Sequence, residues 1–154
     1  MSSNNRLLFF VNFVRIKKNN KMRKIEHIGI AVKSLEVSNV LFEKLFGQPP
    51  YKEEEVASEG VKTSFFMNGP NKIELLEATN PDSPIAKFLE KKGEGIHHIA
   101  FDVNDINEEV IRLKKEGFVI LNEIPKKGAD NKLVVFLHPK GTNGVLIELC
   151  QEIK

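Results

Sequence analysis

The chain of 154 residues contains a single cysteine, Cys150. One cysteine excludes an internal disulfide, and it leaves the chain compatible with a reducing compartment. Long apolar runs are also missing, because the longest one near the start, Leu7 to Val11, is far shorter than the roughly 20 residues that cross a bilayer. The sequence therefore predicts neither an internal disulfide nor a membrane partner.

Acidic residues are absent from the first 24 positions, which hold seven basic side chains. The other 130 residues carry 16 basic and 21 acidic groups, so the body of the chain has a net charge of −5 although the whole chain has +2. An acidic body lacks the basic surface that displaces phosphate counterions, so we expect no nucleic-acid partner.

Three interpretations of residues 1–21 stay open: a disordered tail, an extension before a start at Met22, and a weak organelle presequence. We favour an extension or tail and treat residues 22–154 as the folded domain. The expected location is the cytoplasm, or the mitochondrial matrix if the extension is a presequence.

Comparison of the chain with itself shows an internal repeat. His27-Ile-Gly-Ile-Ala-Val32 matches His98-Ile-Ala-Phe-Asp-Val103 at an offset of 71 positions. Ile73-Glu-Leu-Leu76 likewise matches Ile147-Glu-Leu-Cys150 at an offset of 74. The two modules, about 25–79 and 96–151, each read as a strand, a helix that ends at a glycine, and three further strands.

Caps and periodicity place the elements of both modules. Ser34 and Gly47 bound a first helix, Asp105 and Gly117 bound a second, and a short linker helix spans 83–93, with Pro84 in its first turn. The first helix carries the apolar residues Val37, Val40, Leu41 and Leu45. Strands after the helices are predicted near 51–56, 61–67, 72–78, 118–123, 133–138 and 145–150.

A small βαβββ module buries little core alone, so we expect the two modules to pair. The predicted fold class is α+β, with both modules in one curved mixed sheet, helices on one face and an open cleft on the other. Modules can also pair between chains, which makes a homodimer compatible with the pattern.

Strand alternation predicts which side chains face the cleft. In both repeated strands the apolar set should pack against helices, so His27 and His98 point into the cleft. Glu74 and Glu148 lie between apolar neighbours and turn the same way. A solvated position has no reason to keep its residue type in both modules. We therefore interpret the four as ligands of one divalent metal rather than as ordinary polar residues, with Zn, Fe, Co, Mn and Ni all compatible.

Three further residues are predicted to be structural. His97 shares parity with the apolar set and should pack at the strand edge, away from the cleft. His138 should close the strand before the Pro139 turn. Cys150 shares the cleft parity of Glu148 but is expected to be a small buried hydrophobe.

These residues resemble the vicinal oxygen chelate, or glyoxalase-like, superfamily and, more narrowly, its methylmalonyl-CoA epimerase family. The resemblance runs from about Ile25 to Gln151. The blocks that carry it are His27-Ile-Gly-Ile-Ala-Val32, Asp82-Ser-Pro-Ile-Ala-Lys-Phe-Leu89, Gly95-Ile-His-His-Ile-Ala100, Phe136-Leu-His-Pro-Lys140 and Gly144-Val-Leu-Ile-Glu-Leu149. The central helix block and the closing blocks are the more specific ones.

The resemblance implies a metal-dependent epimerase of propionate metabolism that interconverts (R)- and (S)-methylmalonyl-CoA through a metal-stabilised enolate. It implies one divalent ion, often cobalt, with Mn, Zn, Ni or Mg as alternatives, held by His27, His98, Glu148 and Glu74. Glu148 is the predicted catalytic base, and Glu74 is a weaker candidate for the opposite face. Thr63 stands where some members carry a second catalytic glutamate, so the second base is open.

Other functions use a similar site. A glyoxalase I-like isomerase acting on a glutathione hemithioacetal would share the ligand set. A non-haem iron oxygenase typically has two histidines and one carboxylate, so a fourth ligand at Glu74 argues against it. A metal-free ligand-binding member of the superfamily is disfavoured because all four positions hold ligand-type residues.

Overall fold

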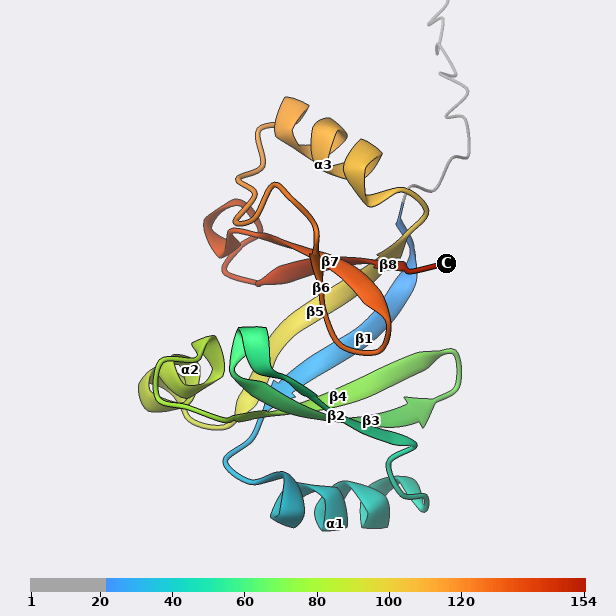
Figure 1. Cartoon of the computed structure of the whole chain (residues 1–154), viewed down its shortest axis with the longest axis vertical. Coiled ribbons are helices and arrows are strands. Elements are labelled where there is room, and N and C mark those ends of the chain that lie inside the picture. The colour runs from blue at the N-terminus through green and yellow to red at the C-terminus, as the bar shows by residue number, and fades with distance from the viewer. Residues whose placement is uncertain (1–21) are drawn as a thin grey trace, which may run out of the picture.

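The computed structural model describes residues 22–154, and the predictions for residues 1–21 lie outside this range. Eight strands form one curved sheet in the order β2-β3-β4-β1-β5-β8-β7-β6, with three α-helices against it (Figure 1). Within residues 22–154, no helix is long and apolar enough to span a bilayer.

The first module contains five of the regular elements and a short 3-10 turn at Ala57–Glu59. Its elements are β1 (Met22–Ala31), α1 (Leu35–Phe46), β2 (Lys52–Val56), β3 (Val61–Asn68) and β4 (Asn71–Ala78). The helix begins at Ser34, whose hydroxyl accepts a hydrogen bond from the Val37 N–H, and it ends at Gly47 in the left-handed conformation, as predicted.

The second module follows the linker helix α2 (Pro84–Lys92), which is capped by Ser83 and ends at Gly93. Its elements are β5 (Gly95–Val103), α3 (Ile106–Lys115), β6 (Lys126–Lys127), β7 (Lys132–Leu137), a 3-10 turn (Pro139–Gly141) and β8 (Ile147–Glu152). The side chain of Asp105 caps α3 by accepting from two backbone N–H groups.

The two modules occupy equivalent halves of the sheet. β1 pairs in parallel with β4, and β5 pairs in parallel with β8. The modules join where β1 and β5 run antiparallel at the centre of the sheet. The predicted α+β fold with two paired modules is thereby confirmed.

The predicted strand at 118–123 is wrong. Only Ile120 makes an isolated bridge there, to Leu137, and the regular strand is the two-residue β6 further on. The side chain of Asn122 explains the difference, because its amide oxygen accepts from the Phe136 N–H and its amide nitrogen donates to the Val134 carbonyl. A side chain thus takes backbone groups of β7 that a regular strand would pair.

Most of the hydrophobic core lies where α1 and α3 pack against the sheet, and a smaller cluster under α2 joins Ile85 to Ala31, Val61 and Leu76 on the cleft side. Under α1 it contains Val32, Leu35, Phe66 and Leu75, and under α3 it contains Val103, Ile106, Val110, Leu113, Val135, Leu137 and Leu149. The apolar residues by which the first helix was recognised (Val37, Val40, Leu41 and Leu45) are exposed. Leu35, Phe42 and Phe46 pack inward instead. The helix was therefore predicted correctly, but the apolar residues that indicated it are not the ones that it buries.

Candidate metal centre

Four neighbouring strands at the centre of the sheet bring together the four predicted ligands. His27 lies on β1, Glu74 on β4, His98 on β5 and Glu148 on β8, and each is no more than 5% exposed. The strand register explains the convergence. Gly29 pairs with both Glu74 and His98, and its repeat equivalent, Ala100, pairs with both Glu148 and His27. The structure thus places the four side chains as predicted, while their role as ligands stays a prediction.

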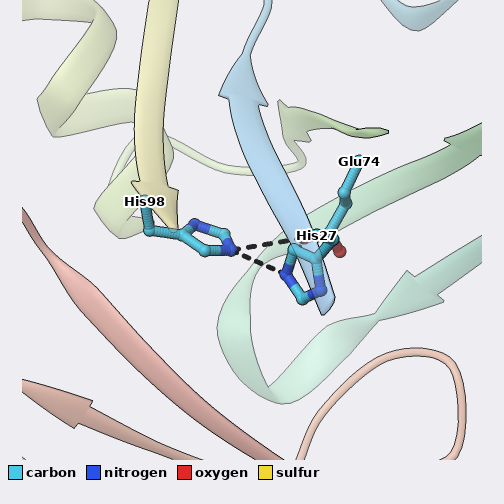
Figure 2. Close-up of side chains that lie close together, drawn as sticks. All are labelled: His27, Glu74 and His98. Atoms are coloured by element: carbon cyan, nitrogen blue, oxygen red, sulfur yellow. Dashed lines mark hydrogen bonds and ion pairs between the residues drawn. The ribbon is translucent and has the colours of Figure 1, made fainter. Parts of the chain in front are cut away.

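The donor atoms of these side chains face one another. The Nε2 atoms of His27 and His98 are 2.9 Å apart, and Glu74 Oε2 lies 3.1 Å from the first and 3.4 Å from the second. Glu148 completes the group, with oxygens 3.3 Å from Nε2 of His98 and 3.9 Å from Nε2 of His27. Figure 2 shows His27, Glu74 and His98 pointing to a common centre from three strands.

The residues present fit a divalent metal. One ligand atom each from His27, Glu74 and His98 lies within 4.8 Å of the others. Metal–nitrogen and metal–oxygen bonds of about 2.0–2.2 Å hold neighbouring donors roughly 3–3.5 Å apart. The distances among His27, Glu74 and His98 and from His98 to Glu148, 2.9 to 3.4 Å, are close to this spacing, and only the 3.9 Å from His27 to Glu148 is longer. Two imidazoles and two carboxylates buried together also favour a cation, because buried charges are normally paired or coordinate a metal.

The four side chains line a cleft of about 290 Å³. Apolar side chains line much of the remaining wall, among them Val56, Val61, Leu76, Ile85, Leu121 and Leu146, together with a few charged groups such as Glu59 and Lys126. The turn between β6 and β7 closes one side, since Asp130 accepts from Tyr51 and Lys72 and its N–H donates to Glu54. The cleft therefore combines a polar centre with walls suited to an apolar ligand segment.

Neighbouring charges shift the pKa values of both proposed ligands of the first module, His27 and Glu74, so that both side chains favour their charged forms. Burial alone would lower the pKa of His27, but the carboxylates of Glu74, Glu26 and Glu148 outweigh it and raise that pKa well above its usual value. Burial alone would raise the pKa of Glu74, but the charges and hydrogen bonds of His27 and His98 outweigh it and hold that pKa at about 2. Glu74 is thus a firmly ionised carboxylate.

Glu148 behaves in the opposite way. Burial raises its pKa, and the negative charges of Glu74 and Glu26 add to that effect, while the two histidines only partly offset it. The neighbouring Cys150 is fully buried with Ala100 and Val134, as predicted for a small hydrophobe, and burial raises the pKa of its thiol. Glu148 is the carboxylate of this centre with the greater affinity for a proton.

Glu26 is a site residue that the sequence did not reveal. Its carboxylate is buried, accepts from Nδ1 of His27 at 2.5 Å, and pairs with Lys72. Burial alone would raise its pKa, but the hydrogen bonds from His27 and Lys72 outweigh burial and hold the pKa at about 2. Strand alternation gave no signal for it, because the residue before a cleft-facing histidine should point to the other face.

The prediction that His97 points away from the cleft is wrong. His97 lines the cleft, its Nδ1 lies 3.0 Å from Nδ1 of His98, and its ring packs edge-on against Phe88. Burial and the adjacent His98 lower its pKa to about 4, so the ring is neutral at physiological pH. His138, by contrast, closes β7 as predicted and accepts from the Lys140 N–H.

Two small residues shape the centre. A Cβ at Gly29 would come within 2.2 Å of the His98 ring, so only glycine leaves room for that imidazole. Thr63 is buried on β3 and lines the cleft, but its hydroxyl is directed to the Glu54 carbonyl oxygen at 3.4 Å. No carboxylate therefore stands at the position where a second base was considered.

Comparisons with known proteins agree with this geometry. Residues 26–136 match the model of the Glyoxalase/Bleomycin resistance protein/Dioxygenase superfamily. The chain is 43% identical over 131 residues to the ethylmalonyl-CoA/methylmalonyl-CoA epimerase of Cereibacter sphaeroides, covering 83% of this chain and 97% of the relative. It is 41% identical over 129 residues to the human mitochondrial methylmalonyl-CoA epimerase, covering 83% and 73%.

A solved structure shares the fold as well as the sequence. A methylmalonyl-CoA epimerase in complex with methylmalonyl-CoA and NH4+ superposes with a TM-score of 0.82 at 33% identity, over 85% of this chain and 95% of the other. The repeat, the sheet and the sequence similarity lead to one assignment. The chain belongs to the Glyoxalase/Bleomycin resistance protein/Dioxygenase superfamily and, within it, to the methylmalonyl-CoA epimerase family.

Proposed function

We propose that this chain is a metal-dependent epimerase that interconverts (R)- and (S)-methylmalonyl-CoA, a step of propionate metabolism. The observation that carries the proposal is the convergence of His27, Glu74, His98 and Glu148 in one buried cleft. Family membership supports the substrate, since a relative of the same fold is solved with methylmalonyl-CoA. The apolar walls of the cleft suit the non-polar part of an acyl-CoA arm.

His27, His98, Glu74 and Glu148 would hold the metal, for which we propose cobalt, with Mn, Zn, Ni and Mg as alternatives. A bound divalent ion supplies a Lewis acid that stabilises negative charge on the substrate oxygens as the proton leaves. The chain's own contribution is to bury the centre and to fix both imidazole rings by backbone register. Burial keeps water from competing for the reacting groups.

Glu148 is the proposed catalytic base. The α-proton of the substrate is bonded to the carbon between the carboxylate and the thioester, and both groups make it more acidic. Its pKa nevertheless remains above that of an ordinary carboxylic acid. A base is most effective when its own pKa is raised toward the working pH, and burial raises the pKa of Glu148. A coordinating cation would lower that pKa, so the roles of Glu148 as ligand and as base are tested separately, by cobalt binding and by α-proton exchange.

Epimerisation also requires a proton donor on the opposite face. Glu74 stays the predicted partner for that role, although its pKa of about 2 makes it a better ligand than base. Thr63 is unsuited to it, because a neutral hydroxyl does not remove a proton from carbon at physiological pH and this one is directed to the backbone. A homodimer likewise stays a prediction, which sedimentation velocity would test.

Proton NMR of the cobalt-loaded protein with methylmalonyl-CoA in D₂O tests the proposal. We expect rapid loss of the α-proton signal, abolished in His98→Ala. Metal bound at about one ion per chain without exchange would favour the glyoxalase I-like isomerase, which the same sample would reveal with a glutathione hemithioacetal. Absence of bound metal from the purified and reloaded protein would overturn the proposed centre.

A further inference from the structure

The pairing of β1 with β5 contains three register shifts, and two of them, one in each strand, are β-bulges related by the internal repeat. Between the pairs Ile25↔Phe101 and His27↔Ala100, β1 advances two residues while β5 advances one, which leaves Glu26 as the extra residue. Between Gly29↔His98 and Ile30↔Ile96, β5 advances two residues while β1 advances one. The extra residue there is His97, which is the repeat equivalent of Glu26.

Each bulge re-aims one side chain. In a regular strand, the residue before a cleft-facing histidine points to the opposite face. A bulge breaks this alternation and bends the strand locally. Glu26 and His97 accordingly both line the cleft, beside His27 and His98. Bulges recur next to active sites, where they direct a side chain that the regular pleat would turn away.

Both re-aimed side chains contact the same atom of the histidine that follows. Oε2 of Glu26 lies 2.5 Å from Nδ1 of His27. Nδ1 of His97 lies 3.0 Å from Nδ1 of His98. In each module the ring nitrogen on the far side, Nε2, is thereby left to face the partner histidine, and the two Nε2 atoms are 2.9 Å apart.

Each contacting side chain is itself held in place. The carboxylate of Glu26 pairs with Lys72, which also donates to Asp130 on the β6–β7 turn at 2.7 Å. The ring of His97 packs edge-on against Phe88 of α2, with centroids 5.0 Å apart. Supporting contacts of this kind are what keep a ligand-orienting residue in one conformation.

We propose that Glu26 and His97 are a repeat-related pair of positioning residues, one in each module, which hold the two histidines with Nδ1 engaged and Nε2 presented to the metal. Neither residue is a ligand. Glu26 does more than His97, because a carboxylate fixes the Nδ1–H tautomer and also increases the electron density of the ring, whereas a neutral imidazole only fixes the tautomer. The inference rests on the proposed metal centre and extends it to the two residues that contact its histidines.

Cobalt affinity measured by calorimetry on the full chain tests the pair. Loss of an orienting partner typically costs about 10- to 100-fold in metal affinity, and we expect Glu26→Ala to fall near the upper end and His97→Ala near the lower end. Glu26→Gln and His97→Asn should restore most of the loss, because the amide of each offers an acceptor near the original position. Ser64→Ala is a matched control. The buried Ser64 hydroxyl has no hydrogen-bond partner within residues 22–154, and its removal should leave the affinity unchanged.

A spectroscopic readout separates orientation from a general loss of stability. In the zinc-loaded protein, long-range ¹H–¹⁵N spectra should show His27 and His98 protonated at Nδ1 and bound through Nε2. In Glu26→Ala, only the Nδ1–H signal of His27 should broaden by exchange, and in His97→Ala, only that of His98. Unchanged cobalt affinity in both alanine variants, or coordination through Nδ1, would overturn the inference. If the unmodified chain binds no cobalt, the proposed centre fails instead.

Discussion

The two modules build equivalent halves of one sheet but provide the site with different chemistry. The first contributes Glu26, His27 and Glu74, an ionised group in which two carboxylates have a pKa of about 2. The second contributes His97, His98 and Glu148, in which the pKa of His97 is lowered to about 4 and that of Glu148 is raised. Symmetry of the backbone is therefore combined with asymmetry of charge.

This difference separates two tasks that the chemistry requires. A strongly ionised carboxylate with two histidine partners is a good metal ligand, whereas a carboxylate with a raised pKa is a better proton acceptor. Titratable groups whose surroundings push their pKa values apart indicate acid and base roles. The comparison supports Glu148 as the proposed base, while two residues of each module, His27 and Glu74 of the first and His98 and Glu148 of the second, remain the proposed ligands.

The largest expected effect on α-proton exchange comes from replacing either carboxylate, Glu148 or Glu74, by an amide in separate variants. Glu148→Gln should lower α-proton exchange by about 10³-fold, the middle of the range for loss of a general base. Glu74→Gln keeps an oxygen ligand, so it should weaken cobalt binding while reducing exchange less. NMR in D₂O with cobalt at saturation measures exchange, and calorimetry measures binding.

Separate (R)- and (S)-methylmalonyl-CoA samples sharpen this test. Each base removes the proton of one isomer, so Glu148→Gln should block exchange of one isomer more strongly than of the other. If Glu74 serves the opposite face, Glu74→Gln should show the reverse preference. Equal exchange in Glu148→Gln and the unmodified protein would contradict the base assignment.

The next largest effect concerns the small residues opposite the histidines. Gly29→Ala would drive a Cβ to 2.2 Å from the His98 ring, so the imidazole must move and cobalt affinity should fall at least tenfold, as for other losses of ligand orientation. Ala100→Gly, the equivalent change in the second module, removes a methyl group and should cost about 0.5–1 kcal/mol of stability with little effect on affinity. Calorimetry and thermal melts check both.

A similar loss of cobalt affinity in Gly29→Ala and Ala100→Gly would contradict this prediction. It would show that backbone flexibility at these positions, and not contact with the His98 ring, determines the affinity for cobalt. Gly29→Ser provides a further comparison, since it places the same Cβ next to the ring. It should weaken binding at least as much as Gly29→Ala does.

A moderate effect is expected from metal removal, with a defined pH dependence. In the EDTA-treated protein, the low pKa of Glu74 stabilises the fold above pH 4.5, and this stabilisation is lost as the pH falls toward 2. The raised pKa of His27 gives stability that is present below 6.5 and lost as pH rises through the folded-state pKa. Between about pH 4.5 and 6.5, the lowered pKa of His97 stabilises the fold as pH rises, whereas the raised pKa of Glu148 stabilises it as pH falls, so these two effects oppose each other. The thermal midpoint should therefore be highest between about pH 4.5 and 6.5.

Cobalt should change this profile, because a bound ion replaces protons on its ligands. The midpoint should rise on loading, and the rise should be greater at pH 8 than at pH 5.5. Thermal melts with EDTA and with cobalt across this range provide the measurement. A midpoint of the EDTA-treated protein that increases steadily from pH 6 to 8 would contradict the assigned charge state of His27.

Much of the site could be predicted because each type of candidate ligand occurs at the equivalent position of both modules. Matching positions of the two modules hold His27 and His98, and likewise Glu74 and Glu148. Strand alternation alone was sufficient to predict that these four side chains point into the cleft. The caps at Ser34 and Asp105 were equally readable, because a side chain that accepts from the first helical N–H groups is a local property of the sequence.

The rest depended on register between distant segments. Glu26 and His97 face the cleft only because β1 and β5 slip by one residue against each other, and neither strand encodes that slip alone. The failed strand at 118–123 has a similar cause, since Asn122 reaches across to β7. Alternation of side chains is a property of regular strands. It therefore gives wrong predictions where a bulge interrupts the backbone hydrogen bonds or a side chain takes their place.

The smallest effect is expected on β3, where the two modules also differ. Thr63 pairs with Leu76 as Val134 pairs with Cys150, so these two cleft-lining residues are equivalent. Thr63→Val makes the first module resemble the second and removes one long hydrogen bond to the Glu54 carbonyl oxygen. We expect exchange to change by less than about threefold and stability by less than about 1 kcal/mol, the typical net value of one hydrogen bond. A loss of exchange as large as that of Glu148→Gln would place Thr63 in proton transfer, and the base of the opposite face would then have to be sought on β3 rather than on β4.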